Sequence, residues 1–226
     1  IIENIGKKLS ELFTINVGIA TLRDDLYFLD GKDVKGHFKL LNNNKYYIDS
    51  ELVKSIYKIS DFKDKNRVEN NERKIIFPYK VSNNKSNIID EDTLKKDFPN
   101  TYKYFIQIKN ELLARSKKTI LKPFFQYGRS QGLNKFGIRL LTPTFSQKPN
   151  FLIVKEKDSL YCNGYGIHYN SDQNRSTLFD IYPIQKSENI DVLGRILNSN
   201  IMDYYIKTTS VTIDGGYPCY QKNFIE

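Results

Sequence analysis

Hydrophobic and polar residues follow two kinds of spacing along the chain, and together they predict separate groups of strands and helices. Runs with β-branched or aromatic residues between turn signals predict strands at 15–21, 26–30, 45–49, 74–80, 137–143, 150–156, 160–169 and 177–184. Helical spacing occurs at 1–14, 90–117 and 189–209. Because strands and helices do not alternate regularly, we expect an α+β fold with a mixed or antiparallel twisted sheet and flanking helices.

Local signals refine two of these segments. In 90–117, Asp90 or Asp92 is suited to cap the first helical turn, and Pro99 is suited to begin a second helix after Phe98. The stretch 60–74 is polar and is expected to form a surface loop.

The length of 226 residues fits one large domain or two small ones, and we expect a single self-supporting domain over residues 1–226. The sequence has no run of eighteen apolar residues and no signal-peptide pattern at its start, so we expect no membrane association and a cytoplasmic location. Cys162 and Cys219 stand apart, which argues against a zinc site or a disulfide framework. The first residue is not Met, and we therefore expect a segment of a longer protein.

Positive charge is concentrated in one part of the sequence. The formal net charge is +9, from 35 basic and 26 acidic residues, and nine of the basic residues lie between Leu112 and Lys155, where there is no Asp or Glu. Aromatic residues are interleaved with them: Phe124, Phe125, Tyr127, Phe136, Phe145 and Phe151. Lys and Arg neutralise phosphates, and aromatic rings pack on bases and sugars, so this segment indicates nucleic-acid binding. The alternative is a helix end followed by core strands with a solvated basic face.

Motifs for a complete active site are missing. There is no phosphate-binding G-x-x-x-x-G-K, no strand-borne G-x-G-x-x-G and no G-x-S-x-G. His37 and His168 have no ligand partner at helical spacing, which favours ordinary satisfied or exposed histidines. Asp64 followed by Glu72 and Lys74 is similar to the acidic residue and E-x-K of metal-dependent nucleases, but the short spacing and polar surroundings favour a solvated loop.

Four stretches, in this order, resemble one family. They are 17-VGIATLRDDLYFLD-30 (the N-terminal motif), 127-YGRSQGL-133 (the arginine loop), 194-GRILNSNIMDYYIK-207 (the helix motif) and 214-DGGYPCYQKNFI-225 (the C-terminal motif). The chain thereby resembles the TaqI-like C-terminal specificity domain, the target recognition domain of adenine-N6 DNA methyltransferases and related fused restriction-modification enzymes. Family members often have Trp before the Gly-Arg pair, and this chain has none.

The resemblance implies that cofactor binding and catalysis belong to a different domain of the parent enzyme. In such enzymes a separate catalytic methyltransferase domain of the same parent chain binds S-adenosylmethionine and grips the flipped adenine with a Pro-Pro motif. No Pro-Pro pair occurs here, so we expect this segment to bind double-stranded DNA without catalysis and without a cofactor of its own.

The basic segment and the resemblance together give the expected DNA-binding residues. They are Arg115, Lys117, Lys118, Lys122, Tyr127, Arg129, Ser130, Gln131, Lys135 and Arg139. Arg129 is suited to guanine O6 and N7 or to phosphate, and Gln131 to adenine N6 and N7. In the alternative, Arg129 pairs with a buried carboxylate inside the domain.

Two other functions remain open at this point. The chain is also compatible with a recognition domain of a type I specificity subunit, which is not an enzyme. Less favoured is a metal-dependent nuclease using Asp64, Glu72 and Lys74. The sequence does not give the DNA target, because base contacts depend on loops positioned by the fold.

Overall fold

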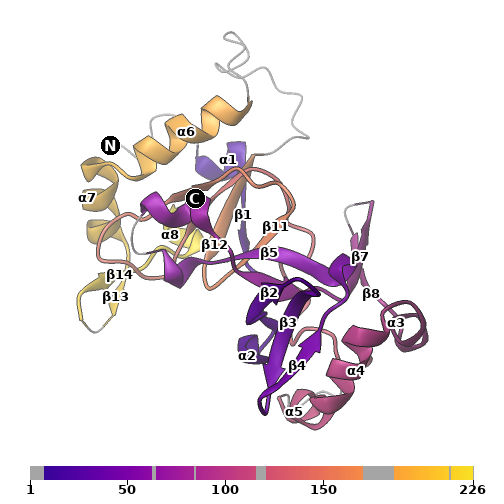
Figure 1. Cartoon of the computed structure of the whole chain (residues 1–226). Helices are drawn as coiled ribbons and strands as arrows, with labels where there is room; N and C mark the ends of the chain where they lie inside the picture. The colour runs from indigo at the N-terminus through magenta and orange to yellow at the C-terminus, as the bar shows by residue number, and fades with distance from the viewer. Residues whose placement is uncertain are drawn as a thin grey trace. The chain divides into compact units, whose positions relative to one another are not determined.

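The computed structural model describes residues 8–62, 65–83, 85–115, 121–169, 186–213 and 215–225, and it has the predicted α+β fold (Figure 1). The backbone contacts divide the chain into two compact units. Unit 1 comprises Ile1–Gly18, Lys58–Asn70 and Lys135–Glu226, and unit 2 comprises Ile19–Tyr57 and Asn71–Asn134. That the whole chain acts as a single recognition domain stays a prediction.

Unit 1 is built on a four-stranded antiparallel sheet with the order β1-β12-β9-β10. Its strands are β1 (Phe13–Val17), β12 (Tyr165–Tyr169), β9 (Arg139–Thr142) and β10 (Leu152–Val154). The register aligns Ile15 with Ile167, Ile167 with Leu140, and Leu140 with Ile153. Directly opposite side chains share one face of a sheet, so this row provides a continuous apolar surface for the helices.

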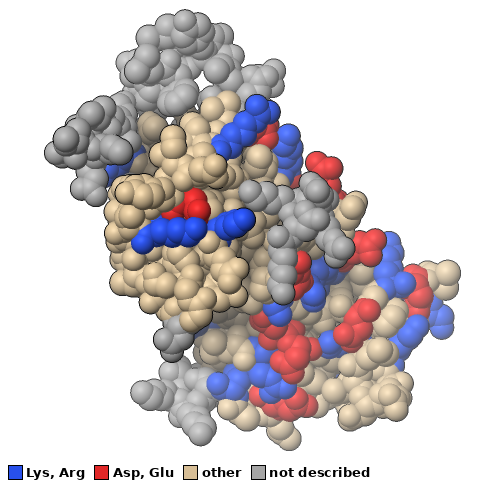
Figure 2. Space-filling model, turned by 90° about the vertical axis from the view of Figure 1, so that its left-hand side faces the viewer, with Lys and Arg blue, Asp and Glu red and all other residues tan. Residues whose placement is uncertain are grey.

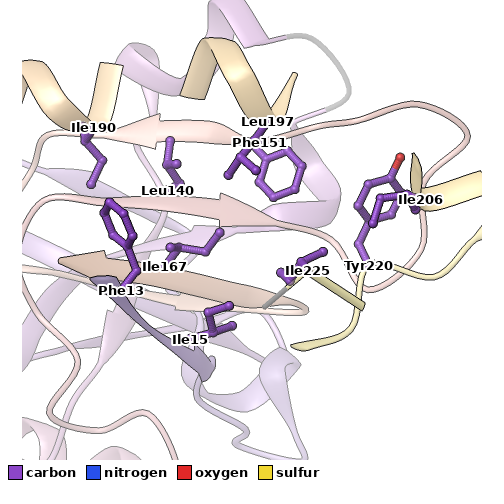
Figure 3. Packing of buried hydrophobic residues seen from close by; sticks show 10 residues of the cluster. All are labelled: Phe13, Ile15, Leu140, Phe151, Ile167, Ile190, Leu197, Ile206, Tyr220 and Ile225. Atoms are coloured by element: carbon purple, nitrogen blue, oxygen red, sulfur yellow. The ribbon is translucent and has the colours of Figure 1, made fainter. Parts of the chain in front are cut away.

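Helices α6 (Lys186–Leu197), α7 (Asn200–Thr209) and α8 (Lys222–Ile225), with α1 (Leu9–Leu12), contribute to the core on this sheet (Figure 3). Gly194 lets α6 approach the strands closely, because a Cβ atom there would lie 3.1 Å from Ile153 and 3.2 Å from Leu140. Figure 3 shows Ile190 and Leu197 of α6 beside Leu140 and Phe151, while Ile206 lies near Tyr220. The helix motif and the C-terminal motif therefore meet in one core.

Leu197, the last residue of α6, and the two residues after it each stabilise this part of unit 1. Leu197 is buried in the core. The Asn198 side chain accepts from the backbone N–H of Phe151 at 2.9 Å and donates to its carbonyl at 2.9 Å and to that of Gly194 at 2.7 Å. Ser199 caps α7 by accepting from the N–H of Met202 at 3.3 Å. The Leu-Asn-Ser string thus joins two helices to the sheet.

The remaining described elements of unit 1 are short. They are η3 (Ile59–Asp61), η4 (Lys65–Asn70), β11 (Ser159–Cys162), β13 (Thr212–Ile213) and β14 (Tyr217–Pro218). The surface loop expected at 60–74 is corrected in part: the 3-10 turns η3 and η4 form here, and Phe62 and Val68 are buried. The strand expected at 177–184 lies outside the described residues.

Unit 2 contains three small antiparallel arrangements. Strands β2 (Gly31–Asp33), β3 (Gly36–Leu41) and β4 (Asn44–Tyr47) form one sheet. Strand β5 (Val53–Lys58), preceded by η2 (Ser50–Leu52), pairs with β6 (Lys74–Ile76), and β7 (Tyr79–Ser82) pairs with β8 (Lys85–Ile88) as a hairpin. The strand expected at 74–80 is therefore two strands, separated at Phe77 and Pro78 because proline lacks the N–H for a continuous ladder.

The predicted helical segment 90–117 is confirmed over its described part as α3 (Glu91–Asp97), α4 (Pro99–Gln107) and α5 (Lys109–Ala114). Asp90 caps α3 through the N–H of Thr93 at 2.8 Å, and Pro99 occupies the first turn of α4. Both positions match the sequence signals, because an N-cap acceptor and a first-turn proline suit the free N–H groups of a helix start.

The strand expected at 26–30 is corrected to a helical turn, α2 (Asp24–Tyr27). The Thr21 hydroxyl donates to Asp24 at 2.5 Å and accepts from the N–H of Arg23 at 3.1 Å, which fixes the chain just before the turn. Only Phe28 keeps a strand-like bridge, to Ile75. Within the described residues, no helix is long and apolar enough to span a membrane.

Candidate nucleic-acid interface

The arginine loop, 127–133, is held in unit 2 by the N-terminal motif. The N–H of Gly128 donates to the carbonyl of Thr21 at 3.1 Å, and the N–H of Arg129 donates to that of Ala20 at 3.1 Å. Ala20 and Arg129 thereby form an isolated antiparallel bridge. Two of the four family-like stretches, far apart in sequence, are therefore neighbours in the fold.

Arg129 presents its side chain outward from this fixed backbone. The residue is exposed, and its guanidinium has no hydrogen bond or ion pair within the parts of the chain that the structure describes. This geometry contradicts the alternative in which Arg129 pairs with a buried carboxylate. A fixed backbone with a free cationic end is suited to an external anion or a base edge.

Tyr127, in contrast, belongs to the core of unit 2. It is 2% exposed, its N–H donates to the Tyr79 hydroxyl at 2.6 Å, and its own hydroxyl donates to the Ile76 carbonyl at 2.6 Å. Its ring meets those of Tyr27 and Tyr79 edge-on, at centroid distances of 5.0 and 5.1 Å. Burial raises the pKa of the Tyr79 hydroxyl, which stays protonated. The expected DNA contact by Tyr127 is corrected: this side chain anchors the loop.

Arg115, the residue directly after α5, holds the segment that precedes the arginine loop. Its guanidinium donates to the Tyr27 hydroxyl at 2.8 Å, to the Phe124 carbonyl at 3.1 Å and to the Gln126 carbonyl. The Tyr27 hydroxyl in turn donates to the Phe125 carbonyl at 2.8 Å. Burial raises the pKa of Tyr27 to about 12, against the opposing effect of the Arg115 charge. Arg115 therefore positions residues 124–126, and a contact between this half-buried side chain and DNA stays a prediction.

An open pocket of about 600 Å³ lies beside the arginine loop within unit 2. Its lining comes from the β7–β8 hairpin and from the loop: Tyr79, Ser86, Asn87, Ile88, Leu121, Gln126, Tyr127, Gly128, Arg129, Ser130 and Leu133. None of these described lining residues is an Asp or Glu. The Ser86 hydroxyl donates to the Leu133 carbonyl at 2.7 Å and ties the hairpin to the end of the loop. The described lining of the pocket thus combines polar and apolar side chains and contains no acidic one.

The hairpin was missed by the sequence analysis, although a signal for it exists. Two short runs, 79–82 and 85–88, flank an Asn-Asn pair, and Asn favours the left-handed conformation that tight turns need. Asn83 indeed has a φ of 49°.

The other expected DNA-binding residues have different surroundings. Lys122 and Ser130 are exposed in unit 2, Gln131 is half-buried, and Lys117 and Lys118 lie outside the described residues. Lys135 is half-buried in unit 1.

Arg139 has no access to DNA in this structure. It is 0% exposed, and its guanidinium donates to the Gly137 carbonyl at 2.7 Å and to the Ser159 carbonyl and hydroxyl at 3.0 and 2.7 Å. Its charge also lies 5.2 Å from the Tyr161 ring centroid. The prediction that Arg139 contacts DNA is therefore wrong, because strand β9 directs this side chain into the core.

The basic segment is divided between the two units. Residues up to Asn134 belong to unit 2 and those from Lys135 belong to unit 1, where Lys155 pairs with Asp191 at 3.4 Å. On the face drawn in Figure 2, Lys and Arg side chains are interspersed with Asp and Glu. Charge counted along the sequence therefore does not show which basic side chains share a surface, and only the exposed ones are candidates for contact with DNA.

The residues of the nuclease alternative can be placed only in part. Glu72 is exposed, and the Lys74 ammonium donates to the Ser55 hydroxyl at 2.5 Å, whereas Asp64 lies outside the described residues. Among described residues, no group of three or more His, Cys, Asp and Glu side chains is arranged to hold a metal ion.

His168 belongs to unit 1. Its Nε2 is 3.2 Å from the Tyr161 hydroxyl. Burial, together with the charges of Arg139 and Lys135, lowers the pKa of His168 to about 4. The imidazole is therefore neutral near pH 7 and serves as a satisfied internal polar group.

Comparisons with known proteins leave the family open. No protein-family model matches the chain, and no curated protein matches it.

Proposed function

We propose that this chain is the DNA sequence-reading module of an adenine-N6 DNA methyltransferase from a restriction-modification system. One observation carries the proposal: an exposed arginine, Arg129, stands on a loop with a fixed backbone beside a pocket whose described lining has no acidic residue. Such a site favours the electronegative edges and phosphates of DNA over cationic or neutral ligands.

The loop carries groups that suit a DNA groove. The Arg129 guanidinium can bind guanine O6 and N7 as a bidentate donor, and the exposed Ser130 hydroxyl can donate or accept beside it. Gly132 has a φ of 71°, a conformation natural to glycine, so the chain turns sharply after Gln131. Because the backbone is already fixed, binding needs little further ordering of the loop.

In this proposal, DNA recognition and adenine methylation are carried out by different domains of the parent enzyme. A catalytic domain of the same parent chain binds S-adenosylmethionine and methylates the adenine, and the present chain supplies specificity on double-stranded DNA in the cytoplasm. The chain itself then binds no S-adenosylmethionine, and calorimetry with the cofactor measures this directly.

The test compares wild type with Arg129→Ala on a duplex library with randomised central base pairs, selected by binding and then sequenced. If Arg129 reads a guanine, the variant loses about 1–3 kcal/mol of discrimination at one position of the selected site. Lys122→Ala should instead weaken all sequences alike and flatten the salt dependence, as expected for a phosphate contact.

Arg195→Ala provides the matched control, because Arg195 is also exposed but lies on α6 of unit 1. Its affinity and selected sequence should equal those of wild type. Thermal melting verifies that each variant is folded. The proposed function is contradicted if folded Arg129→Ala keeps the affinity and the base preference of the wild type. It is also contradicted if the wild type shows no salt-dependent binding to duplex DNA.

A further inference from the structure

The β7–β8 hairpin is a narrow two-stranded antiparallel ribbon (Figure 1). Its register pairs Tyr79 with Ile88, Lys80 with Asn87, Val81 with Ser86, and Ser82 with Lys85. A two-stranded ribbon is one of the two protein elements that fit the major groove of B-DNA. An isolated hairpin is only marginally stable in water, so the first question is what holds this one in place.

One row of the hairpin is tied to the arginine loop. Opposite residues share a face, which places Tyr79, Ile88, Val81 and Ser86 together. Tyr79 is buried and its hydroxyl accepts from the N–H of Tyr127, while Ser86 donates to the Leu133 carbonyl. The hairpin is thereby fixed at both ends of the loop that carries Arg129.

The other row is free for contact. Lys80, Ser82, Lys85 and Asn87 are all exposed, and they alternate with the anchoring row. The sequence from 79 to 88 contains no Asp or Glu. The nearest acid in sequence, Asp90, accepts from the N–H and hydroxyl of Thr93 at 2.8 and 2.7 Å as the cap of α3. The free row is therefore basic and amide-bearing.

We propose that this hairpin is a second DNA-reading element, which enters the major groove with Asn87 at a base edge and Lys80 and Lys85 at phosphates. The inference rests on the proposed function and extends it from one loop to a pair of connected elements. Asn matches the N6 and N7 groups of adenine, and Lys neutralises phosphate as a point charge. The anchoring row makes the hairpin and Arg129 a single preorganised surface.

Two substitutions test the two roles on the same randomised duplex library. Asn87→Ala should lose about tenfold or more of the preference for adenine at one position, because a bidentate contact is removed. Lys85→Ala should weaken binding to all sequences and reduce the slope of log affinity against log salt by about one unit, and Lys85→Arg should restore that slope.

Matched controls come from the same unit. Asn44→Ala changes an exposed strand asparagine on β4, and Lys95→Ala changes an exposed lysine on α3. Both should keep the wild-type preference and salt slope. Thermal melting of each variant separates loss of contact from loss of fold.

The outcomes distinguish this inference from the proposed function. If folded Asn87→Ala and Lys85→Ala bind like wild type while Arg129→Ala loses discrimination, the hairpin role is overturned and the proposed function stands. If Asn87→Ala weakens every sequence alike, the base-reading role is overturned. If the wild type binds no duplex at low salt, both proposals fall.

Discussion

Replacing Tyr127 by Phe isolates the anchoring hydroxyl of the arginine loop. The substitution keeps the ring, whose edge-on contacts with Tyr27 and Tyr79 do not need the hydroxyl. It removes the donor to the Ile76 carbonyl at 2.6 Å, in a side chain that is 2% exposed. The carbonyl then loses this buried partner, and water has little access to replace it.

The expected cost follows from that loss. Removing one partner of a buried hydrogen bond costs about 1–3 kcal/mol in the free energy of unfolding, through the desolvation of the group left behind. Tyr127→Ala also removes the ring, and truncation of a buried aromatic costs about 3–5 kcal/mol. The two variants therefore form a graded series at one site.

Urea unfolding followed by circular dichroism measures both values, because the chain has no Trp to report by fluorescence. Because the chain has two compact units, the unfolding curve must first be shown to contain a single cooperative transition before a free energy is derived from it. Tyr102→Phe is the control in the same unit: its half-buried hydroxyl donates to Glu91 at 3.1 Å, and its loss should cost less than about 0.5 kcal/mol. Unchanged stability of Tyr127→Phe together with lost DNA affinity would refute the anchoring role.

Two further predictions concern unit 1. The pKa of His168 lies near 4 in the folded chain, below the usual value of 6.5, so the unfolded state binds the proton more readily, and stability should fall by up to about 3 kcal/mol as pH decreases from 6.5 toward 4. Melting curves of wild type and His168→Gln across this range check it, and an equal pH dependence in the two would contradict it. Asn198→Ala should cost about 2 kcal/mol, because it removes the hydrogen bonds to the Phe151 backbone. Asn200→Ala, at an exposed position on α7, is the control by urea unfolding.

Local signals in the sequence determined much of the secondary structure. Asp90 and Pro99 act at helix starts, where a side-chain acceptor or a missing N–H suits the unpaired backbone groups. Strands of unit 1 formed where apolar residues were concentrated, as at 137–143 and 150–156. These features depend on neighbours within a few residues, so the sequence alone was sufficient, and the α+β class followed from their order.

The tertiary structure decided which basic and aromatic side chains of the predicted site face solvent. Arg129 is exposed, whereas Arg115, Tyr127 and Arg139 bind backbone carbonyls inside their units. The sequence alone did not show which of these four side chains would be exposed, because composition and spacing do not reveal which distant segments will pair. The bridge between Ala20 and Arg129 is a contact of this kind. This bridge forms only when the chain folds. It fixes the backbone of the arginine loop, from which the exposed Arg129 side chain extends.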